Sequence, residues 1–268
     1  MNVLARRAAD LLGISVAEAR PMAGGDLSQC MRLRLEDGRE AVAKTGPAPP
    51  EEARMLAAIA ATGAPAPAVL AVDATLLVLE ALPDTGAGPG AEADLGQVVA
   101  RLHAAAGERY GWHADYAFGP VAIANAWAED WPAFWGERRL LCHAGHLPVP
   151  LFQRVERLAG DLRSRLPERP RAALLHGDLW SGNVLTAGDR VSGLIDPACY
   201  YGHAEVDLAM LSLFGRPGPA FRIAYGPSEP GASERAAIYK LWPALVHRRL
   251  FGAGYDGLVE GCLEAAGA

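Results

Sequence analysis

Three polar residues between positions 173 and 207 have the types and spacing that phosphoryl transfer requires. Asp178 follows an apolar run in a His-Gly-Asp triplet, Asn183 lies one short loop later, and Asp196 ends a second apolar run. A carboxylate can accept the proton of an attacking hydroxyl, while an amide oxygen and a second carboxylate can hold Mg²⁺ beside phosphates. We therefore predict that Asp178 is a catalytic base and that Asn183 and Asp196 are metal ligands. The alternative is a surface turn with incidental acids.

The N-terminal part of the chain contains candidates for binding phosphates. A glycine pair precedes an alternating strand, an Asp-Gly hairpin turn and a second strand over residues 40–44. Backbone N–H groups beside glycine can approach phosphate oxygens closely, and a hydroxyl or a lysine can add to them. The two acids that open a helix predicted over residues 51–61 could pair with that lysine. The candidate phosphate-contacting residues are Gly24, Gly25, Asp26, Ser28 and Lys44.

A boundary between two lobes is expected near Leu82. Strands predicted over residues 69–72 and 76–79 lead to Glu80 and Leu82, where the chain is expected to leave the sheet. A segment rich in Gly, Pro and Ala follows. Beyond it, apolar residues recur at helical spacing over residues 95–106, 151–166, 208–214 and 238–251, whereas residues 215–233 are dense in Pro and Gly and predict a loop. We expect an N-lobe over residues 1–82 and a C-lobe over residues 83–268.

These motifs resemble those of the fructosamine kinase, or ketosamine-3-kinase, family. The segments that carry the resemblance are His-Gly-Asp-Leu-Trp-Ser-Gly-Asn, Ile-Asp-Pro-Ala-Cys-Tyr-Tyr-Gly-His and Glu-Val-Asp-Leu-Ala-Met. The resemblance implies an α+β, bilobal, protein-kinase-like fold with a small antiparallel-sheet N-lobe and a larger, mainly helical C-lobe. It also implies ATP and Mg²⁺ as cofactors, and a ketosamine, free or protein-bound, as the acceptor. In such a kinase, Glu80 and Leu82 would lie at the hinge between the lobes, where backbone groups bind the adenine ring.

The same resemblance suggests roles for further side chains. The family pattern Glu-Ala-x-x-Leu favours Glu52 as the partner of Lys44, and Trp180 and His203 are candidates for contacts with the acceptor. The family usually has arginine where this chain has Ala204, which removes one possible contact with phosphate or substrate. Asp207 is expected to cap the next helix or to brace the catalytic loop.

The composition sets the broad class of the protein. Among 268 residues, 51% are hydrophobic and 21% are charged, which is ordinary for a globular protein. The formal net charge of −6 gives no basic surface for nucleic acid, and no apolar run reaches the length of a membrane span. The four cysteines form no CxxC pair, so we expect free thiols and a cytoplasmic location. Oligomeric state and any redox role of Cys30 are left open.

Three other functions were weighed. The first is a kinase of the same fold that acts on an aminoglycoside or another metabolite. The second is a non-catalytic nucleotide-binding protein, against which the presence of Lys44, Asp178, Asn183 and Asp196 argues. The third is a metal-dependent hydrolase with His176, Asp178, Asp196 and His203 as ligands, which would leave the glycine pair without a role.

Overall fold

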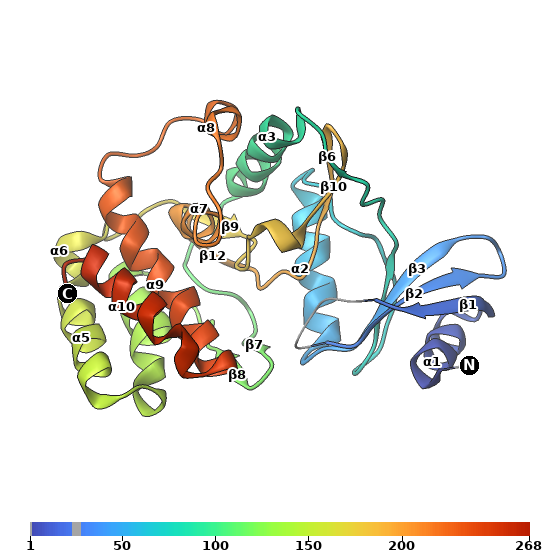
Figure 1. Ribbon diagram of the computed structural model, residues 1–268, viewed down its shortest axis with the longest axis horizontal. Coiled ribbons are helices and arrows are strands. Elements are labelled where there is room, and N and C mark those ends of the chain that lie inside the picture. Colours follow the sequence, from blue (N-terminus) through green and yellow to red (C-terminus); the bar gives the residue numbers. More distant parts are fainter. Residues whose placement is uncertain (1, 23–27) are drawn as a thin grey trace.

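A computed structural model describes residues 2–22 and 28–268 of the chain. An antiparallel sheet with two helices forms one end of the molecule, and a larger assembly of helices forms the other (Figure 1). Three of the candidate phosphate-contacting residues, Gly24, Gly25 and Asp26, lie outside the described residues.

The sheet at the N-terminal end contains five strands within the described part, in the order β1-β2-β3-β5-β4, all antiparallel. The alternation of side chains along the strands gives it two buried faces. Val78 faces helix α1 (Val3–Leu12), while Leu77 and Leu79 face helix α2 (Pro49–Ala61). The strands are β1 (Val16–Pro21), β2 (Cys30–Leu35), β3 (Glu40–Lys44), β4 (Val69–Val72) and β5 (Leu77–Glu80).

The rest of the chain is mainly helical, and its short strands form small sheets of two or three strands in the described part. Its helices are α3 (Ala91–Ala104), α4 (Trp131–Trp135), α5 (Val149–Gly160), α6 (Leu162–Arg165), α7 (Glu205–Leu211), α8 (Pro219–Tyr225), α9 (Ala232–Phe251) and α10 (Asp256–Ala265). Shorter helical turns are η1 (Gly136–Leu140), η2 (Leu141–His146), η3 (Ser181–Asn183) and η4 (Ala253–Tyr255). Its strands are β6 (Gly86–Ala87), β7 (Tyr116–Phe118), β8 (Val121–Ile123), β9 (Ala172–Leu175), β10 (Val184–Gly188), β11 (Arg190–Leu194) and β12 (Tyr200–His203).

Some elements differ from those that the sequence pattern predicts. Strand β1 has no counterpart among the predictions, since its residues alternate weakly between apolar and polar. Residues 215–233 include α8, which the density of Pro and Gly concealed; Pro219 opens this helix, a position that proline tolerates. The helix predicted over residues 151–166 is divided into α5 and α6 at Asp161.

The core of the C-terminal part is rich in aromatic rings. Trp131 and Trp135 are fully buried, and both pack against Tyr239 of α9, whose hydroxyl accepts a hydrogen bond from Trp131 Nε1 at 2.9 Å. The aromatic segment around residues 131–135 therefore belongs to the core. None of the helices within the described residues is both long and apolar enough to span a membrane.

A segment over residues 107–128 crosses from this core towards α2. Gly111 is its critical backbone position because its φ is +116°, in the region that favours glycine, and a Cβ there would lie 2.4 Å from the carbonyl oxygen of Asn125. The backbone N–H of Gly111 donates to the carbonyl of Tyr201 at 2.9 Å, and the N–H of Tyr201 donates back at 2.8 Å. Gly111 thus joins the segment to strand β12.

Replacing Gly111 with alanine should destabilise the protein. Backbone strain of this kind costs about 1–3 kcal/mol, and the clash with Asn125 adds to it, so we expect a loss of at least about 2 kcal/mol in the free energy of unfolding in urea. Gly145→Ala is the control, because nothing lies within 4 Å of a Cβ at that position. Equal stability of the two variants would contradict this account.

Candidate active site

Asp178 and Asp196 are delivered to one site by two pairs of strands. Strand β9 pairs antiparallel with β12 and leads directly into the His176-Gly177-Asp178 triplet. Strands β10 and β11 form a hairpin, and the chain leaves β11 for Asp196. The N–H of Ile195 donates to the carbonyl of Asn183 at 3.1 Å, which holds the two polar loops together.

Asp207 braces the loop that carries Asp178. Its carboxylate accepts backbone hydrogen bonds from His176 N at 2.7 Å and Gly177 N at 3.0 Å, and it lies 3.1 Å from His103 Nε2. Burial raises the pKa of this carboxyl, but these partners outweigh burial and hold the pKa below its ordinary value. Asp207 therefore remains charged and braces the loop, and it lies in the first turn of α7 without capping it.

His176 is a neutral structural residue. Its Nδ1 accepts from the backbone N–H of Asp178 at 3.3 Å, so its Nε2 carries the proton and donates to the carbonyl of Ile195 at 3.0 Å. Complete burial lowers the pKa of His176, which keeps the ring uncharged. Because both ring nitrogens are bonded to the backbone, His176 cannot serve as a metal ligand, and the hydrolase hypothesis loses one of its four ligands.

The carboxyl of Asp178 has the environment of a general base. Burial raises its pKa to about 7, although Asn183 Nδ2 opposes this by donating to Asp178 Oδ2 at 3.0 Å. A carboxyl with a pKa near neutrality can both accept a proton and release it at working pH. The second hydrogen bond of Asn183 Nδ2, to the Asp178 carbonyl at 2.8 Å, fixes the loop between the two residues.

Lys44 lies between two carboxylates that come from distant parts of the chain. Its Nζ is 2.8 Å from Glu52 Oε1 and 2.6 Å from Asp196 Oδ1. Burial opposes the positive charge, but the two carboxylates more than offset that cost, so the pKa of Lys44 lies above its ordinary value. The pairing of Lys44 with Glu52, expected from the sequence, is present in the structure.

The residues expected to bind metal offer oxygen atoms of the right kind. Asn183 uses its amide nitrogen in bonds to Asp178, so its amide oxygen is the atom it can offer to a cation. Asp196 bonds Lys44 through Oδ1, and its side chain is 42% exposed. Amide and carboxylate oxygens suit a hard divalent cation. Asp196 also has a φ of +55°, a strained conformation for a residue other than glycine, which is common at functional sites.

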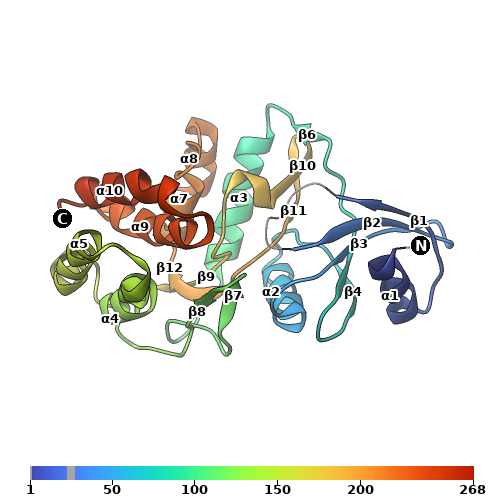
Figure 2. The same cartoon turned by 60° about the horizontal axis from the view of Figure 1, so that its bottom comes forward.

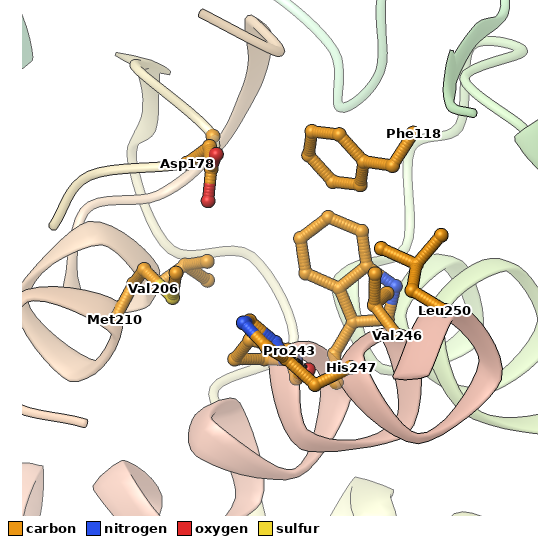
Figure 3. Close-up of a pocket in the computed structure, with 10 residues that line it drawn as sticks. Phe118, Asp178, Val206, Met210, Pro243, Val246, His247 and Leu250 are labelled. Carbon is orange, nitrogen blue, oxygen red and sulfur yellow. Dashed lines mark hydrogen bonds between the residues drawn. The ribbon is translucent and has the colours of Figure 1, made fainter. Parts of the chain in front are cut away.

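An apolar cavity opens beside Asp178 (Figure 3). Asp178 and Phe118 lie on one side of it, and Val246, His247 and Leu250 of α9 lie on the other. Among the described residues that line it, Asp178 and His247 are the titratable ones; the others are Phe118, Gly177, Val206, Met210, Trp242, Pro243, Val246 and Leu250. The carboxyl of Asp178 therefore faces a compartment with apolar walls.

Two residues expected to contact the acceptor lie away from this cavity. Trp180 lines a separate cavity of about 400 Å³, between α3, β10 and α7, together with Leu95 and Phe214. His203 is 2% exposed and points to the hydroxyl of Tyr239, 2.8 Å from its Nδ1. Only a rearrangement would bring His203 to a substrate, and its proposed role gains no support from this geometry.

The remaining expected residues lie at or beyond the ends of interior strands of the five-stranded sheet. Ser28 precedes Gln29, whose N–H donates to Thr45 Oγ1 at 3.1 Å, so it lies near the end of β3. The N–H of Glu80 donates to the carbonyl of Ala68 at 2.9 Å, which excludes that group from contact with an adenine. Leu82 packs against Gly193, where a Cβ would lie 2.2 Å from Leu82 Cδ1.

Arg235 of α9 supplies a guanidinium close to Ala204, where the resemblance led us to expect arginine. Its Nε and Nη2 donate to the two carboxylate oxygens of Glu205 at 2.7 and 2.6 Å. A bidentate pair of this kind is geometrically specific. This guanidinium of α9 is therefore used in an ion pair with the residue next to Ala204.

Sequence reasoning missed several residues that hold the site. His103 supports Asp207, but a single histidine in a helix gave no sign of this. Trp112 Nε1 donates to Glu51 Oε1 at 2.7 Å, and the hydroxyl of Tyr116 donates to Glu52 Oε2 at 3.3 Å. These contacts join residues more than 60 positions apart, and no local pattern could have indicated them.

Known proteins share this fold. The model of the family described as fructosamine kinase matches residues 4–266. A fructosamine-3-kinase candidate from Thermobifida fusca has a solved structure that is 32% identical, with a TM-score of 0.91 and 99% of each chain covered. An aminoglycoside phosphotransferase structure in complex with AMP-PNP and hygromycin B gives a TM-score of 0.69 at 15% identity, with 98% of this chain and 99% of that one covered, and so shows the fold alone.

Two curated relatives match about two thirds of the chain. A protein named probable ketoamine kinase in Synechocystis is 40% identical over 185 residues, which are 63% of this chain and 60% of that protein. The chloroplastic protein-ribulosamine 3-kinase of Arabidopsis thaliana is 34% identical over 183 residues, which are 64% of this chain and 56% of that protein. The aligned part thus spans less than two thirds of these relatives' own lengths.

The fold is the protein-kinase-like fold of small-molecule phosphotransferases, as the sequence predicted. Within that class, the chain belongs to the fructosamine kinase family.

The raised pKa of Asp178 predicts how activity depends on pH. Burial keeps the carboxyl protonated up to about pH 7, so a base at this position is inactive at lower pH. We expect kcat/KM for the acceptor to rise by roughly tenfold per pH unit below about pH 7 and to level off above it. Rates measured from pH 5.5 to 9 provide the test, with Asp37→Asn in the exposed hairpin turn as the control. A profile that is flat or falls over this range would be inconsistent with Asp178 as the base.

Proposed function

We propose that this protein is an ATP-dependent kinase that phosphorylates a sugar hydroxyl of ketosamines, the fructosamine- or ribulosamine-type adducts of amines and protein lysines. The observation that carries the proposal is the convergence of Lys44, Asp178, Asn183 and Asp196 at one site in a chain of the fructosamine kinase family. In cells, such an activity would phosphorylate sugar adducts on proteins as a step of protein deglycation and repair. The four free thiols fit a reducing compartment such as the cytoplasm.

The reaction follows from the positions of these side chains. The acceptor hydroxyl would lie in the apolar cavity, within reach of the Asp178 carboxylate. As its oxygen forms a bond to the γ-phosphorus of ATP, its proton passes to Asp178, and the bond from that phosphorus to the bridging oxygen of ADP breaks. Lys44 would bind the α- and β-phosphates, held in position by Glu52. A bound Mg²⁺ ion, held by Asn183 and Asp196, would supply charge neutralisation for the phosphates.

The cavity favours a ketosamine over an aminoglycoside. Aminoglycosides are polycations and require acidic walls, whereas the residues around this cavity are apolar except for Asp178 and His247. A sugar ring with one linked amine presents flat C–H faces that pack against aromatic side chains, and Phe118 and Trp242 are available for such contacts. The relatives named for ketoamines and protein ribulosamines support the same choice.

Purified protein with ATP and Mg²⁺ should consume ATP when given a ketosamine. The acceptors to compare are fructosyl-lysine, ribulosyl-lysine, an aminoglycoside and none, with ADP formation as the readout. Replacing Asp178 with asparagine preserves the shape of the site but removes the base, so kcat should fall by roughly 10²–10⁴-fold. Turnover of the aminoglycoside alone would reject the proposed substrate, and equal turnover by the variant would reject the proposed base.

A further inference from the structure

The two acids at the start of α2 are held by side chains from the C-terminal part of the molecule. Trp112 Nε1 donates to Glu51 Oε1 at 2.7 Å, and the Tyr116 hydroxyl donates to Glu52 Oε2 at 3.3 Å. His113 Nε2 lies 3.0 Å from the same oxygen of Glu51. Both carboxylates are buried, with exposed fractions of 5% for Glu51 and 1% for Glu52, so the loss of a donor cannot easily be replaced by water.

The segment that carries these donors is anchored on its other side. Gly111 and Tyr201 exchange two backbone hydrogen bonds, and Tyr201 belongs to β12, the partner strand of β9. Further along, the buried Arg139 donates to the Ala124 carbonyl at 2.8 Å and to Asn125 Oδ1 at 2.7 Å. The segment is therefore fixed both to the strands that deliver the catalytic loop and to the aromatic core.

The β7–β8 hairpin connects the ion pair with the cavity beside the base. Successive side chains in a strand alternate between faces, so Tyr116 and Phe118 of β7 share one face. Tyr116 reaches Glu52, whereas Phe118 lines the cavity that Asp178 faces (Figure 3). In the ribbon view, the hairpin lies between α2 and the helices of the C-terminal part (Figure 2).

We propose that Trp112 and Tyr116 are positioning residues for the nucleotide-binding ion pair between Lys44 and Glu52. This inference rests on the proposed function. Lys44 bonds both Glu52 and Asp196. When phosphates take the place of Asp196 at Lys44, the ammonium depends on Glu52 alone for its orientation. The two neutral donors fix the acids of α2 without competing for the charge of Lys44.

The chain offers matched controls for the two positioning residues. Tyr116→Phe and Trp112→Phe remove only the donors and keep an aromatic ring. Tyr110→Phe removes a hydroxyl that donates to the Pro170 carbonyl instead, and Trp127→Phe alters a tryptophan that stacks on Tyr201 without contacting α2 in the described structure. Circular dichroism and thermal unfolding of all four variants check that each one folds.

The positioning role predicts that KM for ATP rises roughly five- to tenfold in Tyr116→Phe and Trp112→Phe, with KM for the acceptor within about twofold of the wild-type value. The dissociation constant of an ATP analogue, measured by calorimetry without an acceptor, should rise by a similar factor. This measurement keeps the inference testable even if no ketosamine is turned over. In a Glu51→Met background, which lacks the oxygen that accepts from Trp112 Nε1, Trp112→Phe should have little further effect.

Other results would overturn the inference. Equal changes in the control variants Tyr110→Phe and Trp127→Phe would indicate a general loss of stability. A change in KM for the acceptor alone would show that Trp112 and Tyr116 affect acceptor binding and not nucleotide binding. Unchanged nucleotide affinity in both test variants would show that the contacts to α2 do not position the ion pair.

Discussion

The buried positive charge of Lys44 is the interaction on which the arrangement of the site depends. One ammonium group joins the end of β3, the start of α2 and the loop after β11, through Glu52 and Asp196. A buried cation without anionic partners is strongly disfavoured, so the two carboxylates stabilise the packing of these three elements around Lys44. The same charge is what the phosphates of a nucleotide would need, and structural and functional requirements therefore coincide at Lys44.

In the loop that carries Asp178, two carboxyl groups have opposite pKa shifts. The charged carboxylate of Asp207 holds the loop, and the carboxyl of Asp178 has a pKa near neutrality. Asp207 is buried but fully hydrogen-bonded, and its pKa is lowered. Asp178 is buried with fewer partners, and its pKa is raised to about 7. Two aspartates on neighbouring elements thus have opposite roles, because the number of donors around each one differs. The neutral ring of His176 is bonded to the backbone of Ile195 and of Asp178 through its two nitrogens, and it fixes the loop between the two strands.

The parts of the site that follow local sequence patterns were predictable, and the parts that depend on tertiary packing were not. The motif spacing correctly indicated that Asp178 and Asn183 lie together, and the resemblance to a known family led to the pair of Lys44 with Glu52. The same reasoning placed His203 near a substrate, whereas the structure buries it against Tyr239. Helix α8 escaped detection because Pro and Gly surround it. The donors from Trp112 and Tyr116 could not be inferred, since only the folded chain brings them to α2.

Phosphorus NMR of the reaction mixture tests the central claim, that this site transfers phosphate to a sugar hydroxyl. The protein is incubated with ATP, Mg²⁺ and fructosyl-lysine, and the spectrum is followed as ATP is consumed. The account predicts a new phosphomonoester signal, coupled to protons of the sugar, that grows in equal amount with ADP. Release of inorganic phosphate alone would show that water, and not the ketosamine, is the acceptor. Transfer of phosphate to the protein itself would contradict direct attack assisted by Asp178.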